Sequence, residues 1–279
     1  MNHRLSSIPG PIGVFDSGYG GLTILSKIRE ALPAYDYIYL GDNARNPYGT
    51  RSFQIVYEFT LQAVTRLFEL GCHLVILGCN TASAKALRSI QINDLHQLDV
   101  NRRVLGVIRP TVECVGGLTA TRHIGLLATP GTVKSESYPL EIKKLFPDVQ
   151  VNSLTCPMWV PLVENNEADG DGADYFIRKY LDELLAKDDK IDTIILGCTH
   201  YPLLLKKIRK YAPQHINIIT QGELVAESLK DYLHRHPEMD AKCTRNGTCI
   251  YYTTESEEKF SESASIFLNE LISVKHIDL

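Results

Sequence analysis

Two copies of one short apolar string constrain the fold of this chain most strongly, because each copy ends in a cysteine. The string Ile-Leu-Gly-Cys occurs at residues 76–79 and again at residues 195–198. The two cysteines are 198 − 79 = 119 residues apart, so they cannot share a local loop and instead indicate two similar halves of the chain. Two thiols in matched surroundings suit chemistry that removes a proton from one face of a carbon atom and returns a proton to the opposite face.

Short apolar segments alternate with longer amphipathic segments along almost the whole chain, a pattern typical of α/β domains with largely parallel sheets. Strands are predicted at residues 12–15, 37–40, 74–77, 104–107, 123–127, 193–196, 216–219 and 250–253. Helices are predicted at residues 22–31, 53–70, 82–90, 133–145, 175–186, 203–211, 224–233 and 258–272. The sequence therefore predicts the α/β class with mostly parallel sheets.

A second matched pair of segments supports an internal duplication. Ile-Gly-Val-Phe at residues 12–15 and Ile-Gly-Leu-Leu at residues 124–127 each precede a loop with small polar residues, at an offset of 112 residues. This offset is close to that of the cysteine strings. We predict a first domain of residues 1–103 plus 216–279, which carries Cys79, and a second domain of residues 104–215, which carries Cys198.

Composition excludes several classes of protein. The 29 basic and 33 acidic residues give a net charge of −4 without a basic block, so nucleic acid is not an expected partner. Residues 1–11 have no long apolar core, and no run approaches the ~18 apolar residues of a membrane span. We therefore expect a cytoplasmic protein without a membrane partner.

The seven cysteines contain no Cys-x-x-Cys pair and the nine histidines lack ligand spacing, so we expect reduced thiols and no metal site.

Each of the two repeated cysteines, Cys79 and Cys198, is predicted to lie where a strand ends and a helix begins. Open α/β sheets bind ligands at this edge. A helix N-terminus presents free N–H groups and partial positive charge, which predicts a thiol pKa below its usual ~8.5. A single cysteine is more often a small buried apolar residue, but the matched pair favours a functional interpretation.

The loop DSGYGG at residues 16–21 joins the first predicted strand to the first predicted helix. Its glycines permit close approach of a ligand, and Asp16 and Ser17 stand at the strand end, where they can bind a polar substrate. The spacing is G-x-G-G rather than G-x-G-x-x-G, which disfavours a dinucleotide site, although Asp42 lies at a suitable distance for one. Asp16 could alternatively serve only as a helix cap.

Three further candidates each have a simpler structural alternative. Tyr48 and Gly49 lie in a turn that could reach the same edge of the sheet. Glu164 ends an apolar segment, where partial burial predicts a raised pKa suited to proton transfer, but an exposed loop glutamate is the simpler interpretation. His200 lies two residues after Cys198, where its imidazole could assist the thiol or bind a carboxylate.

Together these motifs resemble the cofactor-independent glutamate racemases of the Asp/Glu racemase superfamily. The matching strings are DSGYGGL at 16–22, GDNARNPYG at 41–49, CNTASA at 79–84 and GCTHYPLL at 197–204, and TTESEEKF near the C-terminus is similar to the family's last strand and helix. The aspartate racemases are less similar, because they carry a Gly-Gly-Met-Gly type of opening and an acidic residue at the position of His200.

The resemblance implies two pseudo-symmetric α/β domains with an active site in the cleft between them. It implies interconversion of L- and D-glutamate for peptidoglycan synthesis, without a cofactor; a homodimer is compatible with it. Substrate contacts are implied for Asp16, Ser17, Tyr48, Gly49, Asn80, Thr81, Thr199 and His200. Catalytic roles are implied for Cys79 and Cys198, assisted by Asp16, Glu164 and His200. A related cofactor-free enzyme acting on aspartate or another small acid is the alternative.

The chain departs from the family pattern at two places. Arg109 stands where the family usually has an acidic residue before proline, and Thr220-Gln221 replaces the usual Asp-Ser before Gly222. Both departures lie outside the core motifs, so we expect them to affect contacts between domains or regulation more than the reaction.

Two other classes of function remain open at the level of sequence. A cysteine hydrolase or acyl transferase could use Cys198 as its nucleophile with His200, although such partners usually come from distant parts of a sequence and this arrangement leaves Cys79 without a role. A ligand-sensing domain could retain the binding site without turnover.

Overall fold

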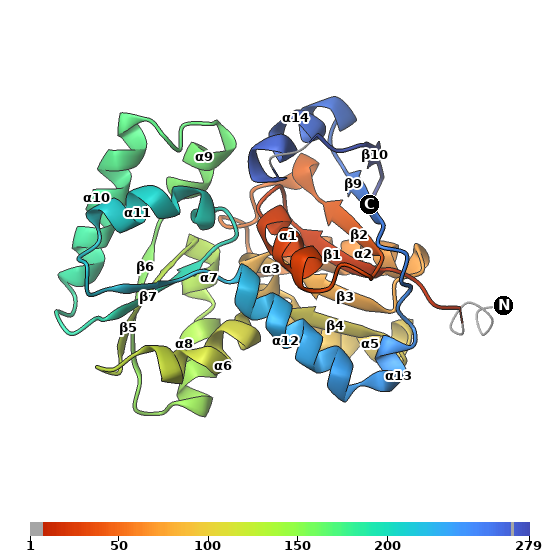
Figure 1. Cartoon of the computed structure of the whole chain (residues 1–279), viewed down its shortest axis with the longest axis horizontal. Coiled ribbons are helices and arrows are strands. Elements are labelled where there is room, and N and C mark those ends of the chain that lie inside the picture. The colour runs from red at the N-terminus through yellow and green to blue at the C-terminus, as the bar shows by residue number, and fades with distance from the viewer. Residues whose placement is uncertain (1–7, 269–270) are drawn as a thin grey trace.

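The computed structural model of the chain describes residues 8–268 and 271–279, which form two α/β lobes side by side (Figure 1). Residues 1–7 of the N-terminal segment, and residues 269–270 of the helix predicted at 258–272, lie outside the described residues. None of the helices in the described ranges is long and apolar enough to span a membrane.

The first lobe is built on a sheet that has, among the described residues, six parallel strands in the order β10-β9-β2-β1-β3-β4. Its strands are β1 (Ile12–Asp16), β2 (Tyr37–Gly41), β3 (Leu74–Leu77), β4 (Arg103–Gly106), β9 (Cys249–Thr253) and β10 (Val274–His276). Its helices are α1 (Gly21–Ala31), α2 (Phe53–Glu69), α3 (Asn80–Lys85), α4 (Leu87–Ser89), α5 (Leu95–Leu98), α12 (Gly222–Arg235), α13 (Pro237–Asp240) and α14 (Glu257–Leu268).

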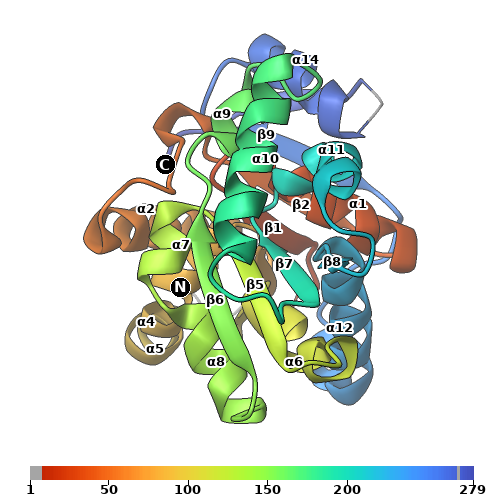
Figure 2. The ribbon, with the colours of Figure 1, turned by 90° about the vertical axis from the view of Figure 1, so that its left-hand side faces the viewer.

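The second lobe contains a parallel sheet with the strand order β6-β5-β7-β8. Its strands are β5 (His123–Ala128), β6 (Gln150–Thr155), β7 (Thr193–Gly197) and β8 (Asn217–Ile219). Its helices are α6 (Ile108–Leu118), α7 (Pro130–Lys134), α8 (Ser137–Leu145), α9 (Trp159–Glu164), α10 (Asp171–Leu185) and α11 (Leu205–Tyr211). Figure 2 turns this lobe toward the viewer, with β5, β6 and β7 side by side.

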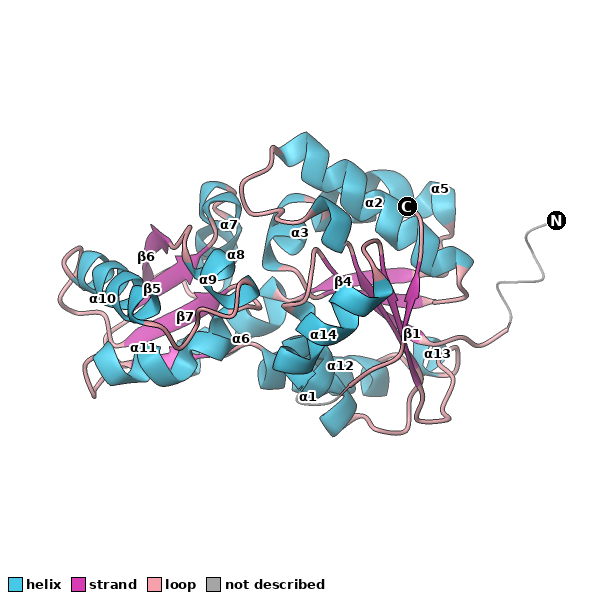
Figure 3. Ribbon diagram, turned by 90° about the horizontal axis from the view of Figure 1, so that it is seen from above, coloured by secondary structure: helices cyan, strands magenta, loops and turns pink. Residues whose placement is uncertain are grey.

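Both sheets are covered by helices on both faces. Successive residues of a strand point to opposite faces of its sheet, so a strand of consecutive apolar residues needs helices on both sides to bury them. In β1, Val14 packs into the cluster beneath α1 and α12, whereas Phe15 packs into the cluster beneath α2. In β7, Ile194 and Ile195 divide between two clusters in the same way. Figure 3 shows α2 and α3 on one side of the first sheet and α1 and α12 on the other. Continuous apolar strands are the sequence signature of this three-layer arrangement.

The two sheets share one topology. The order β2-β1-β3-β4 in the first sheet has the same pattern as β6-β5-β7-β8 in the second. Cys79 follows β3 and Cys198 follows β7, so the two cysteines occupy equivalent positions. The predicted α/β class with mostly parallel sheets is confirmed, and the shared strand order agrees with the predicted duplication.

The predicted domain boundaries assign two strands to the wrong sheet. The strand predicted at residues 104–107 was placed in the second domain, but β4 pairs with β3 in the first sheet. The strand predicted at residues 216–219 was placed in the first domain, but β8 pairs with β7 in the second sheet. Both are short apolar strands, and their composition does not encode which neighbour they pair with. With these two strands exchanged, we retain the proposal of two domains that each carry one cysteine.

Candidate active site

The carboxyl ends of the strands in the two sheets meet at the junction between the lobes. Asp16 is the last residue of β1, and its Oδ2 accepts a hydrogen bond from Thr199 Oγ1, just beyond β7, at 3.3 Å. The hydroxyl oxygens of Thr81 and Thr129, which follow β3 and β5, lie 3.0 Å apart. Ligand sites of parallel α/β sheets occur at this edge, so the junction is the candidate active site.

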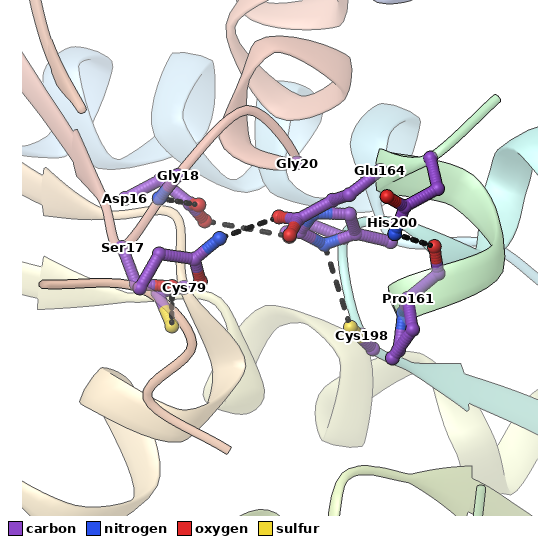
Figure 4. Close-up of polar contacts among 12 residues, drawn as sticks. Asp16, Ser17, Gly18, Gly20, Cys79, Pro161, Glu164, Cys198 and His200 are labelled. Atoms are coloured by element: carbon purple, nitrogen blue, oxygen red, sulfur yellow. Dashed lines mark hydrogen bonds and ion pairs between the residues drawn. The ribbon is translucent and has the colours of Figure 1, made fainter. Parts of the chain in front are cut away.

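Cys79 lies on the side of the first lobe (Figure 4). It is the residue immediately before α3, and its Sγ accepts from the Ala82 backbone N–H at 3.4 Å and lies 3.5 Å from Ser17 Oγ. Burial, with a smaller contribution from the charge of Asp16, raises the pKa of the Cys79 thiol to about 12. The prediction that the helix end lowers this pKa is therefore wrong for Cys79, because burial outweighs the donors of a short helix.

Cys198 lies on the side of the second lobe, at the start of a chain of polar side chains (Figure 4). Its Sγ is 3.8 Å from Nδ1 of His200, and Nε2 of His200 is 2.9 Å from Oε1 of Glu164. The Asn46 side chain, from the first lobe, donates to the same Glu164 oxygen at 2.6 Å. The structure thus aligns a thiol, an imidazole and a carboxylate, a set that can hold and transfer protons.

The charges of His200 and Glu164 stabilise each other. Burial alone would lower the pKa of His200, but its contacts with Cys198 and Glu164 outweigh burial and raise the pKa to about 10. Burial opposes ionisation of Glu164, yet the hydrogen bonds from His200 and Asn46 lower its pKa. The prediction of a raised pKa for Glu164 is therefore wrong, because sequence shows the apolar neighbours of this carboxyl but not its partners.

Replacing Glu164 with glutamine is expected to lower the pKa of His200 from about 10 toward its usual value of 6.5. The substitution keeps the size of the side chain but removes the negative charge that favours the imidazolium. Titration of the His200 ring carbon signal by NMR measures the shift. Glu167→Gln, an exposed residue three positions later, should leave the titration unchanged. Equal titration curves for Glu164→Gln and the unsubstituted protein would contradict the ion pair.

The same ion pair predicts a pH dependence of stability. Because the folded pKa of His200 lies above 6.5, its contribution to the free energy of unfolding is complete below pH 6.5 and is lost as the pH rises through about 10. Urea unfolding between pH 6 and pH 10 should therefore show a smaller decline in stability for Glu164→Gln than for the unsubstituted protein.

Asp16 is fully buried at the centre of the junction. Its Oδ1 accepts from the Gly18 backbone N–H at 2.9 Å. Burial raises the pKa of the Asp16 carboxyl, although the nearby His200 charge and the hydrogen bonds from Gly18 and Thr199 oppose this rise. A buried carboxylate of this kind favours a cation as its neighbour.

The structure also places the remaining predicted contact residues. Asn80 and Thr81 begin α3 beside Cys79, and Gly49 meets the second lobe through its carbonyl, which accepts from the Gly131 N–H at 2.7 Å. Tyr48 is buried, and its hydroxyl donates to Asp42. The Tyr48 hydroxyl is thus already held by another side chain of the first lobe.

Several residues at the junction were not among the predicted site residues, namely Asn46, Thr129, Thr132, Tyr138 and Gln221. Asn46 lies within the GDNARNPYG motif, and the two threonines lie in the loop that matches DSGYGG, so sequence held a signal for them. Tyr138 lies in α8, within an ordinary helical pattern. Its contact with Asn80, 58 residues away in the chain, could not be found without the fold.

Replacing Gly20 with alanine is expected to reduce catalytic efficiency by about 10²-fold, the cost of misplacing reacting groups by about 1 Å. A β-carbon at Gly20 would lie 2.3 Å from Thr199 Oγ1 and 2.5 Å from His200 Nδ1. Gly20 has φ −57° and ψ −35°, a conformation that alanine adopts freely, so the effect is a steric one on the junction. Steady-state kinetics measures it.

Gly117→Ala is the matched control, because a β-carbon there meets nothing within 4 Å. It should leave kcat and KM unchanged. If Gly20→Ala had the kinetics of the control, the close approach of the two lobes at Gly20 would be irrelevant to catalysis.

One cavity lies away from the junction. It has a volume of about 750 Å³, is lined by residues that include Ser83, Arg109 and Tyr232, and reaches neither cysteine. Within residues 8–268 and 271–279, no cluster of three or more histidine, cysteine or acidic side chains could hold a metal ion.

Comparison with known proteins points to one family. The family model described as Asp/Glu/Hydantoin racemase matches residues 12–229. The chain is 38% identical over 273 residues to the glutamate racemase of Roseobacter denitrificans, covering 94% of this chain and 97% of the relative.

Solved structures agree with this match. A glutamate racemase isoform from Bacillus anthracis superimposes with a TM-score of 0.88 at 34% identity, and the match covers 97% of this chain and 98% of that one. The glutamate racemase of Francisella tularensis, in complex with D-glutamate, gives a TM-score of 0.85 at 31% identity, with the same coverage. The resemblance noted from the sequence motifs is confirmed.

Proposed function

The chain belongs to the Asp/Glu/Hydantoin racemase family, and from this premise we propose that it interconverts L- and D-glutamate with two cysteines and no cofactor. One observation carries the proposal. Cys79 and Cys198 follow equivalent strands of two sheets whose carboxyl ends meet, and each thiol has its own polar neighbours. Because the two thiols occupy equivalent positions on two related lobes, each can act on one of two mirror-image molecules, which supports a reaction whose substrate and product are enantiomers.

The reaction requires a proton to leave one face of the α-carbon and another to arrive on the opposite face. One cysteine, as a thiolate, takes the α-proton and becomes a thiol. The other cysteine, as a thiol, donates its proton to the resulting carbanion and becomes a thiolate. In the reverse direction the two roles exchange, so each enantiomer is processed from its own side.

The α-proton of an amino acid is a very weak acid, so the site must stabilise the carbanionic transition state more than the bound substrate. Hydrogen-bond donors directed at the α-carboxylate spread the developing charge. We assign this role to Asn80 and Thr81 beside Cys79, to Thr199 beside Cys198, and to backbone N–H groups at the same strand ends. Ser17 and the Tyr48–Gly49 turn complete the proposed contacts with the substrate.

Asp16 is proposed to bind the substrate ammonium group. Its carboxylate is buried, and a bound cation would offset the unfavourable burial of its charge. The same cation would also counter the charge of Asp16 that helps to raise the pKa of Cys79. Substrate binding would thereby favour ionisation of Cys79 at the moment when a base is required.

His200 and Glu164 are proposed to assist proton transfer at Cys198. The imidazolium stabilised by Glu164 places a positive charge 3.8 Å from the Cys198 sulfur. Both cysteines are only 6% exposed, and we propose that the two lobes move apart to admit the substrate. Closure of the lobes around it would then exclude water and strengthen the electrostatic interactions in the site.

In a cell, D-glutamate made by this reaction would supply peptidoglycan synthesis. We propose a cytoplasmic location, where reduced thiols persist. A homodimer is the partner that we would test first, by light scattering of the purified protein.

Polarimetry of the purified protein without added cofactor tests the proposed function. We expect the optical rotation of L-glutamate to decay to zero and that of L-aspartate to remain constant. Decay with L-aspartate alone would transfer the proposal to the related racemases of other small acids. Binding of glutamate without any change in rotation would instead support a sensing domain.

A further inference from the structure

We propose that Gln221, together with Tyr138, is a positioning residue that holds the side-chain amide of Asn80 in a single orientation. The inference rests on the proposed function, in which Asn80 donates a hydrogen bond to the substrate carboxylate, and it adds residues that act through Asn80. Asn80 comes directly after Cys79, so its orientation bears on the reacting carbon atom.

Four buried side chains from four parts of the fold form this network. Asn80 begins α3, Tyr138 lies in α8, Thr111 lies in α6 and Gln221 immediately precedes α12. Tyr138 and Thr111 have no exposed surface, and Asn80 and Gln221 are 2% exposed. Buried polar groups must find partners within the protein, so the hydrogen bonds of these residues constrain one another.

The direction of the hydrogen bonds follows from one backbone carbonyl. Thr111 Oγ1 donates its single proton to the carbonyl oxygen of Val107 at 2.9 Å, since a carbonyl can only accept. Thr111 Oγ1 therefore acts as an acceptor toward its side-chain neighbours. One of them is the amide of Gln221 at 2.9 Å, so the atom facing Thr111 must be the donor Nε2.

The orientation of Gln221 then determines that of Asn80. Gln221 Nε2 also donates to the Tyr138 hydroxyl oxygen at 2.7 Å, which directs the tyrosine proton toward Asn80 Oδ1, at 2.7 Å. Gln221 Oε1, on the opposite side of its amide, accepts from Asn80 Nδ2 at 2.6 Å. Both ends of the Asn80 amide are thus assigned, and its second N–H remains available to a substrate carboxylate.

This orientation matters because an asparagine amide can flip. In the flipped state Asn80 would present its carbonyl oxygen to the substrate carboxylate, which repels an acceptor. The flip would also set Asn80 Oδ1 against Gln221 Oε1, and it would leave buried polar groups without partners. Gln221 lies where the chain departs from the family pattern. The sequence predicts that this departure affects contacts between domains or regulation more than the reaction; because Gln221 contacts Asn80 directly, we propose an effect on the reaction as well.

A double-mutant cycle between Asn80 and Gln221 tests the inference. Gln221→Met preserves the length of the side chain but removes its hydrogen bonds, and we expect kcat/KM to fall about 5- to 100-fold, the range for unsatisfied buried polar groups. The loss should fall mainly on kcat, because the carboxylate gains charge in the transition state. In an Asn80→Ala background, Gln221→Met should change kcat/KM less than about twofold, because coupled residues are not additive. If the double variant lost kcat/KM by the product of the two separate reductions, the inference would be overturned and the role of Gln221 would be merely structural.

Two further measurements keep the test decisive. Gln91→Met removes a hydrogen bond from the amide of an exposed glutamine to the Val104 carbonyl, outside the network, and should leave the kinetics unchanged. Tyr138→Phe should reproduce the effect of Gln221→Met, because it removes the hydroxyl that links Gln221 to Asn80.

Hydrogen exchange of the Asn80 side-chain amide, followed by NMR, should be slow in the unsubstituted protein and faster in Gln221→Met. Equal rates would overturn the inference whatever the activity. If the unsubstituted protein did not racemise glutamate, the proposed function would fail while this exchange measurement still tested the network. If the unsubstituted protein racemised glutamate but the effects of the Asn80 and Gln221 substitutions on the activation free energy simply added, only the positioning role of Gln221 would fail.

Discussion

Replacement of either Cys79 or Cys198 with serine is expected to slow racemisation of glutamate by about 10²- to 10⁴-fold, the usual contribution of a positioned acid or base. Serine has nearly the shape of cysteine, but its hydroxyl ionises far less readily than a thiol. Each variant would therefore lack one of the two proton-transfer groups, and a racemase with a single base cannot complete the inversion. Circular dichroism of L-glutamate and of D-glutamate with each purified variant measures the loss.

Both enantiomers must show the same reduction of kcat/KM, because they have equal free energies in water and the equilibrium constant between them is one. Cys243→Ser is the matched control. Cys243 is buried to the same extent as the two catalytic candidates, at 6% exposed, but its Sγ donates to the Met239 carbonyl in the first lobe, apart from the junction. This variant should retain activity. A Cys79 or Cys198 variant that stayed as active as the Cys243 variant would refute the assignment of two bases.

Replacement of Asp16 with asparagine is expected to lower kcat/KM roughly 30- to 5,000-fold. This corresponds to a loss of about 2–5 kcal/mol of transition-state stabilisation, the cost of removing one partner from a buried charge pair. Asparagine can keep an oxygen at the position that accepts from the Gly18 N–H, and its Nδ2 can donate to the Thr199 hydroxyl in place of accepting from it, so the local fold should survive. What it lacks is the negative charge proposed to bind the substrate ammonium. Steady-state kinetics of the variant provides the measurement.

Asp192 provides a contrast in which the same substitution should affect stability instead. Its carboxylate accepts from Thr119 and from the backbone N–H groups of Ala120 and Thr121, at the end of the second lobe remote from the junction. Asp192→Asn should lower the unfolding temperature and leave kcat/KM unchanged. If Asp16→Asn also changed only the unfolding temperature, Asp16 would be a structural residue and its proposed contact with the substrate would be wrong.

The central strands were predictable from sequence because they are buried on both faces. Strands such as β1 and β7 are continuous apolar segments, and all eight predicted strands are present. The strands β6 and β10 were missed because they lie at sheet edges, where β6 contains Asn152 and Ser153 and β10 has only three residues. The helix predicted at 133–145 divides into α7 and α8 at Glu136, which adopts a left-handed conformation with φ +54°.

The sequence could predict a residue of the junction when that residue directly follows a parallel strand. Asp16, Cys79 and Cys198 were each placed at a strand end, and the structure brings these ends together. Contacts between distant helices, such as that between Tyr138 and Asn80, depend on the packing of the lobes and leave no local pattern. The pKa shifts of Cys79 and Glu164 were predicted with the wrong sign for the same reason, since burial and partners are properties of the fold.

Racemisation of L-glutamate in D2O tests the central claim most directly, because it follows the hydrogen atom that the two thiols are proposed to handle. If one cysteine removes the α-hydrogen and the other supplies a solvent-derived one, NMR and mass spectrometry early in the reaction should find one deuterium at the α-carbon of D-glutamate. The remaining L-glutamate should be unlabelled at that stage. Formation of D-glutamate that retains the original α-hydrogen would contradict an acid and a base on opposite faces of the substrate.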